Sequence, residues 1–203
     1  MTETVRRRAN TRTRLVDAAE ALFVETGATR VGIDALCARA GFTRGAFYSN
    51  FSSVDDVFFA VYERRTRALL DAVAAAPRPE RPARTVEQIA DHLVDAVPAE
   101  PAWLSLRAGF AARAGHDEAL ETALREHAEQ LRAGLTPRIE ALVADAGLRL
   151  AHDPAEATRI VIAANVGAVL QGPLVDDPRR LRRDVLAAAL AGITRRADEG
   201  ASA

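Results

Sequence analysis

The 203-residue chain contains no lysine and only one cysteine, Cys37. A single cysteine excludes an internal disulfide framework and the zinc sites that are built from several cysteines. The four histidines show no metal-ligand spacing, and no cysteine or carboxylate pairs with them; they are His92, His116, His127 and His152. The sequence therefore predicts neither a metal nor a cofactor.

Short catalytic motifs and targeting segments are also missing. The chain has no GxSxG motif, no P-loop, no dinucleotide-binding glycine fingerprint and no cluster of histidine and carboxylate residues. These absences argue against an enzyme. A signal peptide and an apolar run of membrane length are lacking as well, so we expect a cytoplasmic protein without membrane contact.

Strand-like patterns are rare, whereas apolar residues recur at three- and four-residue spacing, which predicts an all-α fold. After a proline-rich loop at residues 77–84, the predicted helices are Thr85–Val97, Ala102–Ala114, Asp117–Ala146, Pro154–Gln171 and Pro178–Arg196. Pro137 lacks the backbone N–H that an unbroken helix needs, so it marks a point where the third of these helices can kink.

Charged residues are unevenly distributed along the chain, although the net charge is only −1. Residues 1–50 hold eight Arg and five acidic residues, whereas residues 51–203 hold 19 Arg and 23 acidic residues. The N-terminal segment therefore carries an excess of three positive charges. Such an excess suits a partner of negative charge, such as DNA.

The stretch from Ile33 to Phe51 predicts two short helices joined by a tight turn. Its first apolar residues recur at helical spacing and would share one buried face: Ile33, Leu36, Cys37 and Ala40. Gly41 follows the last of them and can adopt the left-handed backbone that ends a helix. Thr43 can then cap the next helix by accepting a backbone N–H.

The second helix, roughly residues 43–50, divides into two faces. At about 100° per residue, Ala46 and Phe47 fall on one side. The other side offers a guanidinium, a phenol, a hydroxyl and a glycine, which suit phosphates and base edges. A helix of this kind, held by a preceding helix across a glycine turn, has the geometry of a helix-turn-helix reader in a major groove. The predicted DNA-binding residues are Thr43, Arg44, Gly45, Tyr48, Ser49 and Asn50.

The same residues resemble a known signature. The run Ala40-Gly41-Phe42-Thr43-Arg44-Gly45-Ala46-Phe47-Tyr48, followed by Asn50-Phe51, is similar to the AGVSKGTLYxHF signature of the TetR family of bacterial transcriptional regulators. The resemblance covers residues 10–59. It implies an all-helical homodimer, usually a repressor, whose larger C-terminal domain binds a small molecule and releases DNA. Val31 and Gly32 replace the family's usual Thr or Ser, and Val54 replaces a common phosphate-contacting Lys.

Residues 1–9 include Arg6-Arg7-Arg8 and show no apolar periodicity. This predicts an arm that is either a solvated tail or reaches along DNA and neutralises phosphates. Asn10 or Thr11 can cap the first helix, whose apolar stripe is Leu15, Ala18, Ala19, Leu22 and Phe23. Residues 1–52 are thus predicted to form the DNA-binding domain, and residues 53–203 a helical domain for ligand binding and dimerisation.

A long helix is expected to join the two domains. Ser53 and Asp56 resemble a capping box, and the helix that they open runs for about 23 residues and ends before Pro77. Its start would pack on the DNA-binding domain and its end on the other. It is therefore the candidate lever between ligand and DNA.

Five residues are predicted to form the site of an apolar or amphipathic effector: Trp103, Arg107, Phe110, His127 and Asn165. The first three lie at i, i+4 and i+7 on one helix face, and the other two would add polar groups from neighbouring helices. Ligand pockets are mostly apolar with a few such groups. The alternative is that Trp103 and Phe110 are core residues and Arg107 is a surface charge.

The last two predicted helices are candidates for a dimer interface. Residues 160–170 are apolar nearly all the way round, which implies a second buried face. The pattern fits either an ordinary core helix or a four-helix interface with two helices from each chain. The predicted interface residues are Ile160, Ala163, Ala164, Gly167, Leu186, Leu190 and Ile193.

Two other functions stay open beside a ligand-released repressor that binds an inverted-repeat operator. The same DNA-binding architecture could be controlled by a protein partner in place of a ligand. Alternatively, the helix-turn-helix could be a corner of the core in a helical enzyme or binding protein. Arg44 and Tyr48 argue against this last possibility, because such a corner has no reason to display both side chains from one short helix.

Overall fold

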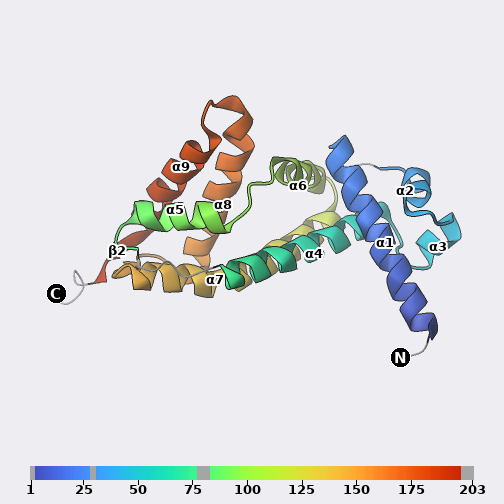
Figure 1. Cartoon of the computed structure of the whole chain (residues 1–203), viewed down its shortest axis with the longest axis horizontal. Helices are drawn as coiled ribbons and strands as arrows, with labels where there is room; N and C mark the ends of the chain where they lie inside the picture. Colours follow the sequence, from blue (N-terminus) through green and yellow to red (C-terminus); the bar gives the residue numbers. More distant parts are fainter. Residues whose placement is uncertain (1–2, 28–30, 77–82, 198–203) are drawn as a thin grey trace. The chain divides into compact units, whose positions relative to one another are not determined.

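The computed structural model describes residues 3–27, 31–76 and 83–197 (Figure 1). The helices are α1 (Glu3–Thr26), α2 (Ile33–Ala40), α3 (Arg44–Tyr48), α4 (Val54–Ala75), α5 (Val86–Ala96), α6 (Pro101–Ala114), α7 (Glu118–Asp145), α8 (Pro154–Gln171), the 3₁₀ turn η1 (Gly172–Leu174) and α9 (Pro178–Ile193). The predicted all-α fold with an N-terminal helix-turn-helix is confirmed. Helix α7 continues through Pro137.

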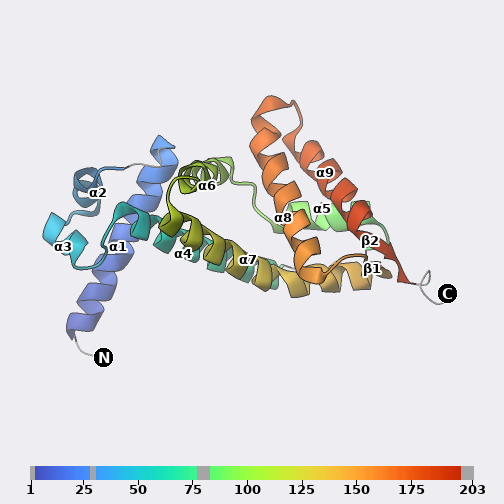
Figure 2. The ribbon, with the colours of Figure 1, turned by 180° about the vertical axis from the view of Figure 1, so that it is seen from behind.

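Two sequence-based boundaries are wrong. Helix α1 begins at Glu3, so residues 3–9 are helical and neither Asn10 nor Thr11 is its cap; residues 1–2 of the predicted arm lie outside the described part of the chain. The last helix ends at Ile193, because Thr194–Arg196 forms a strand, β2, that pairs antiparallel with β1 (Leu148–Leu150) (Figure 2). A three-residue strand is too short for a detectable alternation of apolar residues.

The chain forms two compact units, each drawn from two segments. One unit comprises residues 1–67 and 105–127, and the other comprises residues 68–104 and 128–203. Helices α4, α6 and α7 contribute residues to both units. The predicted boundary after residue 52 divides the chain by function and not by compactness, and it stays a prediction.

The core of the first unit is centred on three phenylalanines from α1, α4 and α6. The Phe58 and Phe110 rings stack with their centroids 3.5 Å apart, and Phe23 meets each of them edge-on at 6.1 Å. All three side chains are fully buried. Ion pairs then join α4 to α1, where Arg64 contacts Asp17 and Glu20.

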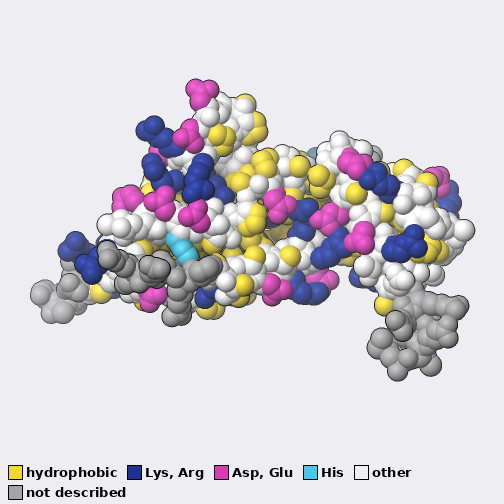
Figure 3. Space-filling view, viewed as in Figure 1, with side chains coloured by type: hydrophobic (Ala, Val, Ile, Leu, Met, Phe, Trp, Pro, Cys, Tyr) yellow, Lys and Arg dark blue, Asp and Glu magenta, His cyan; other side chains and the backbone are white. Residues whose placement is uncertain are grey.

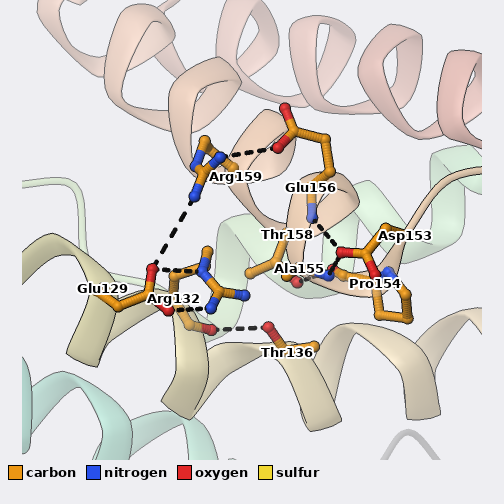
Figure 4. Close-up of polar contacts among 9 residues, drawn as sticks. All are labelled: Glu129, Arg132, Thr136, Asp153, Pro154, Ala155, Glu156, Thr158 and Arg159. Carbon is orange, nitrogen blue, oxygen red and sulfur yellow. Dashed lines mark hydrogen bonds and ion pairs between the residues drawn. The ribbon is translucent and has the colours of Figure 1, made fainter.

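The core of the second unit lies among α5, α7, α8 and α9, and in Figure 1 α5 crosses the lower part of the α8–α9 pair. Its most deeply buried members are Ile89, Ala90, Val143, Ala157, Leu186 and Leu190. Ion pairs also link α7 to α8, since Glu129 binds Arg132 on its own helix and lies 4.0 Å from Arg159, which pairs with Glu156 (Figure 4). The bond from Arg132 lowers the pKa of the Glu129 carboxyl.

Helix α8 contradicts the sequence-based statement that the chain lacks an apolar run of membrane length. Among the described residues, the stretch Pro154–Leu174 is long and apolar enough to cross a membrane by length and composition alone, with a mean hydropathy of 1.2. A core helix of a soluble protein meets the same criterion. Here 33% of the apolar window is buried, and Ala157 and Val161 belong to the packed core of the second unit, which accounts for part of the apolar character of α8.

Candidate nucleic-acid interface

The turn between α2 and α3 forms as the sequence predicts. Leu36, Cys37 and Ala40 are the buried residues of α2. Gly41 has a left-handed backbone with φ of 72°, and its N–H and that of Phe42 bond to the carbonyls of Ala38 and Cys37. These bonds close the end of α2 and set the direction in which α3 leaves it.

Helix α3 has only five residues, so its position depends on one capping bond and one buried ring. The Thr43 hydroxyl accepts the Ala46 N–H at 3.2 Å. Phe47 is fully buried, and its ring lies 6.1 Å from that of Phe51. With Phe47 turned inward, the opposite face of the helix is left exposed.

That exposed face presents Arg44, Gly45 and Tyr48. Tyr48 is 52% exposed, which is unusual for a large aromatic residue. A hydrogen bond with Tyr48 and the charge of Asp34, whose carboxylate lies 3.4 Å away, raise the pKa of Arg44. The nearest atom to a Cβ at Gly45 would be 3.8 Å away, so the fold itself does not require glycine there. The face thus combines a fixed positive charge, a phenol and a stretch of backbone that another molecule can approach closely.

Side-chain groups of the other three predicted DNA-binding residues already bond within the chain, whereas Asn50 Oδ1 is buried without a partner. Thr43 caps α3, as described above. The Ser49 hydroxyl donates to the Ala46 carbonyl at 2.9 Å, and the Asn50 amide donates to the same carbonyl at 2.8 Å. Asn50 is half-buried. Both side chains therefore close the C-terminal end of α3, and any contact with DNA would be additional to that role.

Two arginines of α1 contact residues of the helix-turn-helix, and these contacts were not predicted from the sequence. Arg14 donates to the Ala40 carbonyl at 3.0 Å, and its guanidinium lies 4.8 Å from the centroid of the Phe42 ring. Arg12 lies in the same way over Phe51, at 4.9 Å. Sequence periodicity does not predict these contacts, because they join exposed positions of α1 to residues that lie 26 to 39 positions further along the chain.

The departures from the family signature lie at the starts of α2 and α4. Gly32 is the N-cap of α2 and offers no side-chain bond, where Ser or Thr would satisfy a backbone N–H. Helix α4 begins at Val54 and is capped before it: Ser53 Oγ accepts the Asp56 N–H at 3.0 Å, while the Asp56 carboxylate accepts the N–H groups of Ser52 and Ser53. The predicted capping box is present.

The five predicted effector residues are distributed over both units. Arg107, Phe110 and His127 belong to the first unit, whereas Trp103 and Asn165 belong to the second. Trp103 and Phe110 are buried, as in the core alternative. Asn165 accepts a bond from Arg182 at 2.7 Å. Arg107 lies 4.8 Å from the Tyr62 ring centroid, and His127 lies against Phe59 and Tyr62.

The predicted dimer residues also divide into two sets. Leu186, Leu190 and Ile193 are buried within the single chain, so they are core residues. Ile160 and Ala164 are half-buried against the same core, and Ala163 and Gly167 are exposed on α8. A Cβ at Gly167 would meet no atom within 4 Å. Over α5 and α9, Arg and acidic side chains are interspersed (Figure 3).

Among the described residues, no group of three or more His, Cys, Asp or Glu side chains could hold a metal ion.

Comparison with known proteins agrees with this geometry. Residues 15–61 match the family model of bacterial regulatory proteins of the tetR family. No curated protein sequence matches the chain. The resemblance inferred from the sequence is confirmed for this segment, which contains the C-terminal half of α1, all of α2 and α3, and the start of α4.

Three solved structures illustrate the likeness of the whole chain. GusR of Salmonella enterica has a TM-score of 0.67 at 18% identity, covering 94% of this chain and 98% of its own. A TetR transcription regulator from Haloarcula marismortui has a TM-score of 0.68 at 16% identity, covering 92% and 100%. SmeT, the repressor of the Stenotrophomonas maltophilia multidrug efflux pump SmeDEF, has a TM-score of 0.56 at 24% identity, covering 91% and 90%. At these identities the likeness concerns the fold.

Proposed function

We propose that this protein is a cytoplasmic, sequence-specific transcriptional regulator that binds DNA as a homodimer, with no enzymatic activity. The observation that carries the proposal is the exposed face of α3, where Arg44 and Tyr48 project beside Gly45 while Phe47 is buried. A guanidinium suits guanine or phosphate, and a phenol suits phosphate. The tetR-family match over residues 15–61 supports the same conclusion.

Within this proposal, residues 1–52 read the DNA and residues 53–203 bind the effector and form the dimer. The regulator is a repressor, and a small apolar or amphipathic molecule releases it from an inverted-repeat operator. SmeT, which has a similar fold, is named as a repressor. Release through a ligand is favoured over release through a protein partner by the aromatic residues around Arg107.

Dimerisation through the exposed part of α8 is the remaining element of the proposal. Ala163 and Gly167 leave space in which a second helix can approach closely. Two α3 helices related by a two-fold axis would then read half-sites about 34–36 Å apart on one face of the duplex. Operator symmetry and dimerisation therefore depend on each other.

The test begins with selection of bound DNA from random sequence by the full-length protein. Arg44→Ala and Tyr48→Phe are then compared on the selected site by fluorescence anisotropy, with Arg125→Ala as the control, since Arg125 is an exposed Arg on α7. Each α3 variant should lose about 1–3 kcal/mol of binding free energy, the usual value of one good contact. Operator affinities within twofold of wild type for both α3 variants would refute the assignment of α3 as the reading helix.

A further inference from the structure

The Arg107 cluster consists of Phe59 and Tyr62 of α4, Arg107 of α6 and His127 of α7, all within the first unit. Arg107 is half-buried. In the described part of the chain its contact is with the Tyr62 ring, and neither a carboxylate nor a carbonyl accepts its N–H groups. On the same helix, Arg113 forms two bonds to Asp55 at 3.1 and 2.9 Å. Arg113 is thus paired with a carboxylate, whereas Arg107 is not.

Among the described residues the buried side-chain polar atom without a partner is Asn50 Oδ1, so the guanidinium N–H donors of Arg107 are open to solvent and available to a ligand. A carboxylate fits this fork best, since its two oxygens can accept two parallel N–H bonds. The face of Tyr62 already stabilises the cation on one side. The remaining donors therefore favour a ligand that carries a carboxylate.

The rings of the cluster favour a flat, apolar body for that ligand. Phe59 and His127 stack with their centroids 4.9 Å apart, and His127 meets Tyr62 nearly edge-on at 5.2 Å. Tyr62 is buried, and this burial raises the pKa of its phenol, partly offset by the charge of Arg107. A ligand ring can stack on the half-buried Phe59 and His127 and extend the existing array.

His127 adds one polar position. Its Nδ1 lies 2.8 Å from the Ala123 carbonyl, which can only accept, so Nδ1 is the donor. In the neutral imidazole Nε2 is then an acceptor. A hydroxyl group on the ligand could donate to it.

We propose that the Arg107 cluster binds an aromatic carboxylate, with the carboxylate on the Arg107 guanidinium and the ring against Phe59 and His127. The inference rests on the proposed function in one respect only, namely that the protein has a small-molecule effector. It assigns the chemical class of that effector, an organic anion with a planar apolar body. Neutral apolar compounds of the same shape should bind more weakly.

Isothermal titration calorimetry of the full-length protein with 2-naphthoate and with the neutral 2-naphthamide tests the proposal. Naphthoate should bind wild type at least about tenfold more tightly than naphthamide, because only the anion can form charge-assisted bonds to Arg107. Arg107→Met should reduce naphthoate affinity at least about tenfold while preserving much of the side-chain volume. The control Arg125→Met, on an exposed surface of α7, should bind naphthoate as wild type does.

Three results would overturn the proposal: no naphthoate binding by wild type at millimolar concentration, equal affinity for the two compounds, or unchanged naphthoate affinity in Arg107→Met. Circular dichroism checks that the variants are folded. If Arg107→Met does not fold, the naphthoate-to-naphthamide ratio of wild type and of Arg107→Lys decides, and Lys should lower it because it lacks the fork. Operator binding without ligand is measured separately, so a failure of DNA recognition is distinguished from a failure of this site.

Discussion

At the residue scale, arginine side chains cap the C-terminal ends of helices in this chain, which contains no lysine. Three helices have their C-terminal carbonyls bonded by an Arg from elsewhere in the chain: Arg14 bonds α2, Arg138 bonds α4 and Arg182 bonds α5. The last turns of α4 and α5 contain no basic residue of their own. A cation at this position satisfies orphan carbonyls and interacts favourably with the negative end of the helix dipole.

Arg182 is the most deeply buried of these caps, with a residue exposure of 4%. It donates to the Val97 carbonyl at 2.7 Å, to the Val94 carbonyl at 3.4 Å and to Asn165 at 2.7 Å. Burial is the main reason that the pKa of its guanidinium is lowered, and the charge of Arg179 adds to this. The group stays charged at neutral pH, because arginine is effectively always protonated in proteins.

Replacing Arg182 with Met should lower the free energy of unfolding by about 1–3 kcal/mol, because buried acceptors on α5 and α8 lose their donor. Urea denaturation at a fixed protein concentration measures the change. Arg180→Met is the control, since Arg180 is 72% exposed and its pair with Asp184 at 3.6 Å is a surface contact. Equal stabilities of the two variants would show that Arg182 is not a structural cap.

At the element scale, the second half of α4 is fixed to α7 by close packing as well as by Arg138. A Cβ placed on Gly134 of α7 would lie 2.6 and 2.8 Å from the two terminal carbons of Leu70. The glycine therefore allows a close approach of the two helices within the second unit. If α4 is the lever that transmits the effector signal, its far end is held at this contact.

A double-mutant cycle tests this packing. In a Leu70→Ala background, Gly134→Ala should stabilise the protein by up to about 1 kcal/mol, because alanine is the better helix former. In the wild-type background the same change should be neutral or destabilising, since the Leu70 side chain must move. Chemical denaturation of all four proteins gives the coupling energy, and additive effects would show that the two residues do not constrain each other.

At the scale of the whole molecule, the proposed dimer interface on α8 can be tested at Gly167. Gly167→Arg should block close approach of a second chain and bury an unpaired charge in the interface, so it should yield a folded monomer. Sedimentation velocity measures the state of assembly. Because the single chain has open space at this position, the variant should fold normally. An unaltered dimer would place the interface elsewhere.

Control by an effector has a strict thermodynamic signature. If an effector weakens operator binding, the operator must weaken effector binding by the same factor, typically about 5–150-fold or 1–3 kcal/mol. The measurement is effector affinity by calorimetry, with and without saturating operator. Equal affinities for a tightly bound, specific effector would eliminate control by that ligand and favour the alternative of a protein partner.

The sequence by itself determined the features that depend on local chemistry. Gly41 ends α2 because the left-handed backbone costs a glycine nothing, and Thr43 caps α3 because its hydroxyl reaches a backbone N–H three residues ahead. The faces of α3 followed from the helical period alone. Interactions of this range involve neighbours in the chain, so spacing is enough to predict them.

Only the tertiary structure decided which distant residues meet. Arg182 meets Asn165 and the end of α5 across 17 and more residues, and Arg107 reaches Tyr62 on another helix. Leu190 shows the same limit, because its place in the stripe of α9 favoured a dimer interface over a core. The fold buried it within one chain. Helical periodicity marks which face of a helix is apolar, but the partner that covers that face is chosen by packing.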